Sequence, residues 1–302
     1  MRRIGVLIAV AEDDRDVRAG LDSFLAKLAE YGWREGENFQ IKYRWGGGSV
    51  ARIESFAREL VGWNPDIILA HSTPPVVALL KETRSIPIVF LTVTDPVGQG
   101  LVASLARPGG NVTGFSVFEV SLGAKWLQVL KDIAPEVTRA TIIFNPMTAP
   151  YYNLYLDAIG SRAAAFNIEP FPVQIHSKED FPSVISAAAR GPGSGLFVLP
   201  DSFNVVYRKE IIELAASHRL PAIYYFRYFA MDGGLISYGP DEIDLFLRSA
   251  GYVDRVLRGA EPATLPVQQP SKFDLVVNLR TAQALGLVIP QGVLARADEV
   301  IE

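Results

Sequence analysis

Short apolar segments with strand character alternate with amphipathic segments of helical period along most of the chain. Residues 16–31, for example, carry an apolar residue every three or four positions, which predicts a helix with one buried face. The strand-like runs are continuous and apolar, at 4–10, 67–70, 86–93 and 140–145. Uninterrupted apolar strands separated by helices are typical of parallel sheets covered on both faces. The sequence therefore predicts an α/β fold of the doubly wound, Rossmann-like kind.

The order of segments in the first half recurs in the second. Residues 85–90 lead through a short predicted helix near 97–105 to the run 110–114, and residues 219–224 lead through a similar segment to 233–237. The likeness is weak, but it predicts two lobes of like topology and not one large sheet.

Two further segments follow the second half and need a place in one lobe or the other. A helix is expected from about 241 to 258 and a strand at 273–277. The chain is therefore expected to cross between the lobes more than once. The predicted lobes are 1–117 with about 241–270, and 118–240 with about 271–302.

Composition narrows the possible functions. The 302 residues are 49% apolar and 21% charged, as in an ordinary globular chain. Net charge is −4 and no Lys/Arg cluster exceeds two residues, which argues against a nucleic-acid partner. Cysteine is absent and the three histidines lack zinc-site spacing, so we expect no disulfide, thiol chemistry, metal or cofactor. No run of 18 apolar residues predicts a transmembrane helix.

The amino-terminal segment has two interpretations. Arg2 and Arg3 precede an apolar stretch at 4–11 that resembles a short signal peptide. The stretch is at the lower limit of a signal's apolar region, and the whole segment is too short. A first buried strand is the better interpretation, with any export signal removed before this sequence begins.

No catalytic motif stands out. Gly46-x-Gly48-x-x-Ala51 matches the dinucleotide fingerprint in form, but it follows the second strand, and the acid about 20 residues on, Asp66, begins its strand instead of ending one. A turn before a helix is the better interpretation. The chain has no Gly-x-Ser-x-Gly elbow, no Walker loop and no convincing carboxylate pair, so we assign no catalytic residue.

Polar residues at the carboxyl ends of predicted strands are the strongest site candidates, because ligands of open α/β sheets bind beyond those ends. Ser72 and Thr73 follow the strand at 67–70 and precede Pro74 at a helix start. Their hydroxyls and the free helix N–H groups suit a carboxylate, but a plain helix cap explains them equally well.

Similar positions occur at three other strand ends. Thr94 and Asp95 follow the strand at 86–93, where Asp95 is either a helix cap or the partner of a ligand ammonium. In the second half, Asn145 and the pair Asp201-Ser202 occupy equivalent positions.

Aromatic residues gather next to these strand ends. Tyr151 and Tyr152 lie just past Asn145, and Tyr225 and Phe226 follow the predicted strand that begins at Pro221. Such clusters are more often core than ligand wall, but their place beside the presumed site favours a role in a pocket.

Several runs resemble the ABC transporter substrate-binding proteins of the tryptophan/tyrosine type. The matching runs are DPVG at 95–98, SLARPGGNVTG at 104–114, LPAIY at 220–224, GGLISYG at 233–239 and ARADE at 295–299. The resemblance covers the chain from residue 3 to its end. It implies the type I periplasmic-binding-protein fold, with two Rossmann-like lobes, three crossovers and a ligand cleft between the lobes.

The resemblance also implies a function and roles for the site residues. The ligand would be a small amphipathic molecule, best an aromatic or other apolar amino acid. Ser72 and Thr73 would hold its carboxylate, Asp95 and Asp201 would face its ammonium, and the aromatic residues at 151–152 and 224–226 would shape the side-chain pocket. The expected protein is a monomeric, periplasmic or exported receptor that delivers its ligand to an ABC permease in the inner membrane.

Three alternatives stay open. In the first, the ligand of the receptor is an aromatic carboxylic acid without an amino group. In the second, the chain is an effector-binding regulatory domain, although no helix-turn-helix precedes the first strand. In the third, the chain is an enzyme of the same lobe architecture, although cysteine, a phosphate loop and a well-placed dinucleotide fingerprint are missing.

Overall fold

The computed structural model describes all 302 residues and divides into two compact units. Unit 1 comprises Met1–Glu119 and Glu242–Ser271, and unit 2 comprises Val120–Asp241 and Lys272–Glu302. The chain therefore passes from one unit to the other three times. Both units contain a parallel or nearly parallel sheet with helices, which confirms the predicted fold class.

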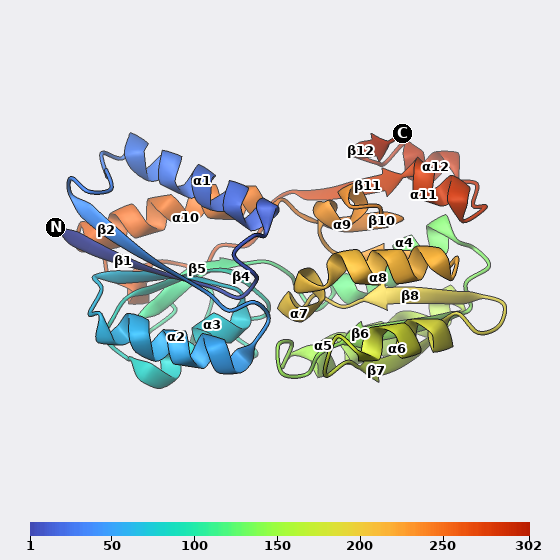
Figure 1. The fold of residues 1–302 in the computed structure, drawn as a ribbon, viewed down its shortest axis with the longest axis horizontal. Helices are drawn as coiled ribbons and strands as arrows, with labels where there is room; N and C mark the ends of the chain where they lie inside the picture. The colour runs from blue at the N-terminus through green and yellow to red at the C-terminus, as the bar shows by residue number, and fades with distance from the viewer. The chain divides into compact units, whose positions relative to one another are not determined.

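Unit 1 is built around a five-stranded parallel sheet. Its elements are β1 (Arg2–Ile8), α1 (Arg15–Glu30), β2 (Phe39–Trp45), α2 (Val50–Gly62), β3 (Ile67–His71), α3 (Thr73–Glu82), β4 (Ile88–Val93), β5 (Val112–Ser116), α10 (Glu242–Leu257) and the 3₁₀ turn η2 (Pro262–Thr264). The strand order is β2-β1-β3-β4-β5. Helices α1 and α10 pack together on one side of the sheet, and α2 and α3 on the other (Figure 1). Because helices cover both faces, β3 and β4 are buried along their whole length.

Unit 2 has a seven-stranded sheet in the order β12-β11-β10-β9-β8-β6-β7. Its elements are α4 (Leu122–Ile133), β6 (Arg139–Phe144), α5 (Tyr152–Ala163), η1 (Ala164–Phe166), β7 (Glu169–Gln174), α6 (Asp180–Ala188), β8 (Ser194–Val198), α7 (Ser202–Val206), α8 (Arg208–Ser217), β9 (Ala222–Tyr224), α9 (Arg227–Met231), β10 (Ile236–Pro240), β11 (Phe273–Asn278), α11 (Leu279–Ala284), α12 (Gln291–Leu294) and β12 (Glu299–Ile301). Every neighbouring pair is parallel except β10 with β11. Between those two strands the chain leaves unit 2 and returns to it.

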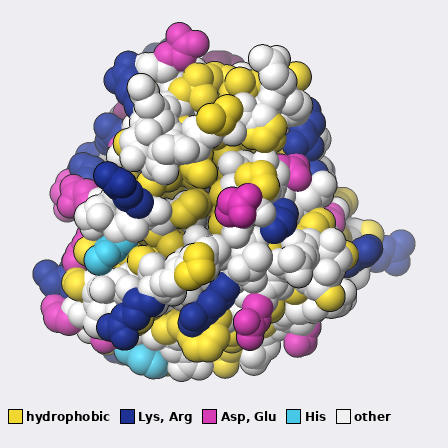
Figure 2. All heavy atoms as spheres, turned by 90° about the vertical axis from the view of Figure 1, so that its right-hand side faces the viewer, with side chains coloured by type: hydrophobic (Ala, Val, Ile, Leu, Met, Phe, Trp, Pro, Cys, Tyr) yellow, Lys and Arg dark blue, Asp and Glu magenta, His cyan; other side chains and the backbone are white.

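The surface of unit 2 has no dominant sign of charge on the face that Figure 2 shows. Lys and Arg side chains there are interspersed with Asp and Glu, and hydrophobic side chains lie between them. No helix in either unit is long and apolar enough to span a membrane.

The predicted short helix near 97–105 is wrong, because turns and bends occupy that segment. Gly100 adopts φ +68°, a left-handed conformation that interrupts a helix. At the end of the segment, the carbonyl of Leu105 accepts a hydrogen bond from the N–H of Val267 (2.7 Å) and not from a following helical turn. That partner lies far along the chain, and no local periodicity reveals it.

In the sheet of unit 1, Gly114 is the position where a side chain is least tolerated. It lies in β5 opposite Phe90 of β4 and adopts φ +152°. A Cβ atom there would lie 2.0 Å from the carbonyl oxygen of Phe90. Backbone atoms of a central strand cannot move aside as a flexible side chain can, so only glycine fits.

We expect Gly114→Ala to lower the free energy of unfolding by more than about 2 kcal/mol, because the methyl group overpacks the β4–β5 pair. Gly62→Ala is the matched control. Gly62 ends α2, and a Cβ there would contact nothing within 4 Å. Urea unfolding of both variants is the measurement, and equal midpoints for Gly114→Ala and the wild type would contradict the expectation.

Candidate ligand-binding site

In unit 1, the candidate site begins where β3 turns into α3. Ser72 adopts φ +78°, and its N–H donates to the carbonyl of Leu91 in the neighbouring strand (2.9 Å). Its hydroxyl makes no capping hydrogen bond to α3, so the plain helix-cap interpretation does not describe Ser72. Thr73, the first residue of α3, is 1% exposed, and its hydroxyl has no hydrogen-bond partner.

Two prolines shape what this helix start offers a ligand. Pro74 and Pro75 are the second and third residues of α3 and carry no N–H group. A helix N-terminus normally presents several free N–H donors to an anion, and here two of them are missing. An anion at this end therefore depends more than usual on the hydroxyl and N–H of Thr73.

The next strand end holds Thr94 and Asp95. Thr94 is buried, and its carbonyl accepts a hydrogen bond from the side-chain amide of Gln99. Asp95 adopts φ +38°, is partly exposed, and accepts the N–H of Gly98 at 2.9 Å. Its carboxylate thus caps a tight turn and retains lone pairs for a further donor. Its predicted contact with a ligand ammonium stays a prediction.

In unit 2, Asp201 connects several strand ends. Its buried carboxylate accepts the N–H of Asn145 (2.7 Å), the N–H of Phe203 (2.9 Å) and the hydroxyl of Thr148. Its backbone N–H and carbonyl both bond to the hydroxyl of Tyr225 (3.2 and 2.8 Å). Burial raises the pKa of this carboxyl from 3.8 to about 6, although the three hydrogen bonds act in the opposite direction.

The remaining predicted residues of unit 2 surround this carboxylate or lie beside it. Tyr151 is 5% exposed and donates its hydroxyl to the carbonyl of Pro200 (3.0 Å). Ser202 is buried, and its hydroxyl has no partner. Phe226 is buried with its ring centroid 5.1 Å from that of Tyr225.

Tyr152 differs from the other predicted aromatic residues because it is only partly buried. Its ring stacks on that of Phe144, with centroids 4.5 Å apart. Of the predicted aromatic residues of unit 2, it therefore has the largest surface left for a ligand.

Sequence reasoning missed some polar residues at these edges. Thr148 lies in a turn and gives no strand-end pattern, although it donates to Asp201. His71 ends β3, and its ring contacts Glu242, which is 171 residues away in the sequence. No local pattern connects that pair.

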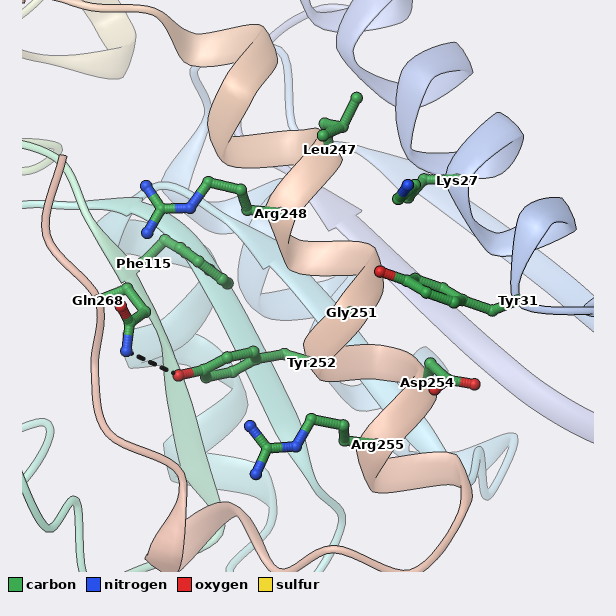
Figure 3. A pocket seen from close by; sticks show the side chains of 10 residues that line it. All are labelled: Lys27, Tyr31, Phe115, Leu247, Arg248, Gly251, Tyr252, Asp254, Arg255 and Gln268. Carbon is green, nitrogen blue, oxygen red and sulfur yellow. Dashed lines mark hydrogen bonds between the residues drawn. The ribbon is translucent and has the colours of Figure 1, made fainter. Parts of the chain in front are cut away.

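Unit 1 also has an open hollow of about 580 Å³ beside α10 (Figure 3). Arg248 lies over the ring of Phe115 at 5.2 Å, and Gln268 donates to the hydroxyl of Tyr252. None of the predicted site residues lines this hollow. It is therefore separate from the candidate site.

Comparison with known proteins decides the family. A family model described as ABC transporter substrate binding protein matches residues 3–301. The chain belongs to this family. This confirms the resemblance seen in the sequence and assigns the chain as the substrate-binding protein of an ABC transporter, whose partners are a small molecule and a transporter permease.

Three relatives of this substrate-binding protein are informative. A conserved domain protein of Vibrio cholerae O1 biovar El Tor is 32% identical, with 99% of each chain covered and a TM-score of 0.91. A tyrosine-binding protein of Clostridioides difficile (strain R20291) is 28% identical over 264 residues, which are 87% of this chain and 75% of the relative. An ABC domain from Streptococcus pneumonia in complex with L-Trp is 24% identical, with 99% of each chain covered and a TM-score of 0.88, which shows a shared fold.

We expect the contribution of Asp201 to stability to fall as the pH rises. The folded state retains the proton of Asp201 to a higher pH than the unfolded chain does, so this contribution is largest below about pH 4 and declines up to about pH 6. At about 1.4 kcal/mol per pKa unit, the decline is roughly 3 kcal/mol.

The measurement is the difference in free energy of unfolding between the wild type and Asp201→Asn from pH 4 to 7. Asp180→Asn is the control, because hydrogen bonds from the N–H groups of His176 and Ser177 lower the pKa of Asp180. Its contribution should instead stay nearly constant over this range, because it is lost only at pH values below about 4. A difference for Asp201→Asn that does not vary with pH would contradict the expectation.

Proposed function

We propose that this substrate-binding protein takes an aromatic amino acid as its ligand and delivers it to the permease. The observation that carries this choice is that one relative is named for tyrosine and another was crystallised with L-Trp. The strand-end residues support it, because they supply one group for each polar end of an amino acid.

The carboxylate of the ligand is assigned to Thr73. A buried hydroxyl without a partner is unfavourable in the unliganded protein and becomes favourable when it donates to an anion. The backbone N–H of the same residue lies at the positive end of α3 and favours the same charge. Ser72 supplies the turn that places Thr73 there.

The ammonium is assigned to Asp95. This carboxylate is partly exposed and accepts one hydrogen bond, from the N–H of Gly98, so it is accessible to a cation. Asp201 already accepts three donors and is 3% exposed, so it is better suited to hold Asn145 and the start of α7 in place. Tyr152 is the first candidate for stacking on the aromatic ring of the ligand.

One alternative ligand is a carboxylic acid with an aromatic ring and no amino group. Such a ligand would bind Thr73 and make no contact with Asp95. The response of the Asp95 variant therefore separates the two ligand classes.

The cellular setting is also part of the proposal. The protein is periplasmic or exported and acts as a monomeric receptor without catalysis or a nucleic-acid partner. The net charge of −4 and the mixed charges on unit 2 support the last point. Chemical turnover of a bound ligand would contradict the receptor assignment.

We expect L-Trp, L-Tyr or L-Phe to raise the unfolding temperature by a few degrees. A ligand at about 100 times its dissociation constant adds about 2.7 kcal/mol to the free energy of unfolding. Asp95→Asn should abolish most of this shift, because it removes the charge but keeps an oxygen for the N–H of Gly98.

Asp180→Asn is the control for that experiment, since Asp180 also accepts backbone N–H groups but lies outside the site. Its ligand-induced shift should match that of the wild type. A shift only with acids that lack an amino group would favour the alternative ligand. No shift with any of these compounds would refute the proposed ligand class.

We expect Thr73→Val to weaken ligand binding about tenfold or more while leaving the unliganded protein as stable as the wild type or more so. The hydroxyl lost has no partner in the unliganded structure, and valine has nearly the same shape.

Thr113→Val is the matched control in the same unit. The hydroxyl of Thr113 is equally buried but donates to the carbonyl of Leu265 at 2.6 Å. That variant should lose about 1–3 kcal/mol of stability and keep its affinity. Calorimetric titration and urea unfolding give both quantities, and unchanged affinity in Thr73→Val would remove Thr73 from the site.

A further inference from the structure

A buried cluster of three polar side chains lies at the carboxyl edge of β3 and β4 in unit 1. Glu242 Oε1 is 2.9 Å from His71 Nε2 and accepts the hydroxyl of Thr92 at 3.1 Å. The three residues are 7%, 3% and 9% exposed, respectively. A carboxylate buried this far from water is retained only where its hydrogen-bond partners are fixed.

Glu242 is the polar contact that orients the ring of His71. An ionised carboxylate only accepts hydrogen bonds, so His71 presents its Nε2–H to Glu242. The other ring nitrogen, Nδ1, has no partner. The ring also stacks on Phe246, one turn further along α10, with centroids 5.6 Å apart. The first two turns of α10 therefore hold the last residue of β3 by one hydrogen bond and one ring contact.

Both donors adjoin strained backbone. Thr92 itself adopts φ +60°, and Ser72, which follows His71, adopts φ +78°. A positive φ is unfavourable for a residue other than glycine and persists where its surroundings enforce it. Candidate-site residues follow each donor: Ser72 and Thr73 come directly after His71, and Thr94 lies two residues after Thr92.

Glu242 also has a particular place in the chain. It is the first residue of α10 and the first residue of unit 1 after the chain returns from unit 2 at Asp241. The carboxylate of Glu242 thus links the point where the chain re-enters unit 1 to the two strand ends that carry the candidate site.

We propose that Glu242 is a positioning residue for ligand binding. It acts through His71 and Thr92 to hold the Ser72–Thr73 turn and the end of β4 in the conformation that accepts the ligand. For its effect on affinity, this role rests on the proposed function. Its effect on the backbone of the two strand ends does not depend on which ligand binds.

The test is Glu242→Gln, with Asp244→Asn as the matched control. Asp244 lies in the same first turn of α10 and carries the same charge, but its side chain is 51% exposed and pairs only with Arg248 at 3.4 Å. Amide hydrogen exchange of the unliganded protein is the first readout. We expect exchange at Ser72, whose N–H donates to Leu91, to rise about tenfold or more in Glu242→Gln and to stay at the wild-type rate in Asp244→Asn.

Affinity for L-Trp and L-Tyr is the second readout. We expect Glu242→Gln to weaken binding about tenfold and to weaken it less in the background of Thr73→Val, because part of the effect of Glu242 passes through that turn. A residue needed only for stability would lower the unfolding temperature, leave the affinity of the folded protein unchanged, and show no such dependence on Thr73. Wild-type exchange and wild-type affinity in Glu242→Gln would overturn the positioning role.

Failure of the proposed function has a different signature. If the wild type binds no aromatic amino acid but exchange at Ser72 still rises in Glu242→Gln, the ligand is wrong and the positioning role stands. If Glu242→Gln does not fold, Thr92→Val removes one of the two hydrogen bonds from the other side, with Thr92→Ser to restore it. Equal exchange in those two variants would overturn the role in the same way.

Discussion

Parallel strand pairing is the constraint from which the rest of this molecule follows. Nine of the ten strand pairs are parallel, so each connection has to return along the outside of a sheet, and most of these returns are helical. In each unit the carboxyl ends of the parallel strands then collect at one edge of the sheet, where the backbone turns from strand to helix. That edge is the one place in each unit where many polar groups lie close to a buried core.

The two units have the same arrangement of polar groups at that edge of the sheet. Each uses one buried carboxylate to bind several strand ends: Glu242 accepts two side-chain donors at β3 and β4, and Asp201 accepts three donors around β6 and α7. Each also leaves one buried hydroxyl unpartnered at the first residue of a helix, Thr73 in unit 1 and Ser202 in unit 2. The carboxylates fix the backbone, and the hydroxyls keep free hydrogen-bonding capacity beside it.

Sequence periodicity was sufficient for the fold class and for most elements, because buried parallel strands and amphipathic helices leave strong local patterns. It failed at 97–105, where Gly100 and a hydrogen bond to the distant Val267 replace a helix. Strand-end position also drew attention to Asp201, but the sequence could not tell a ligand partner from a structural carboxylate. That distinction depends on Thr148 and other donors brought in by the fold, and Glu242 escaped notice for the same reason.

The unpartnered hydroxyl of Thr73 explains why such a site has to be rigid. A buried polar group without a partner is unfavourable, and a flexible turn would relieve it by turning the hydroxyl toward water or a nearby carbonyl. The strained conformations of Ser72 and Thr92, held through Glu242, prevent that relaxation. In the proposed site, the turn keeps this hydroxyl unpartnered until a ligand supplies an acceptor, and a molecule without one leaves the group unpaired. If Thr73 binds the ligand as we propose, discrimination between ligands comes from the same buried contacts that stabilise the strand ends.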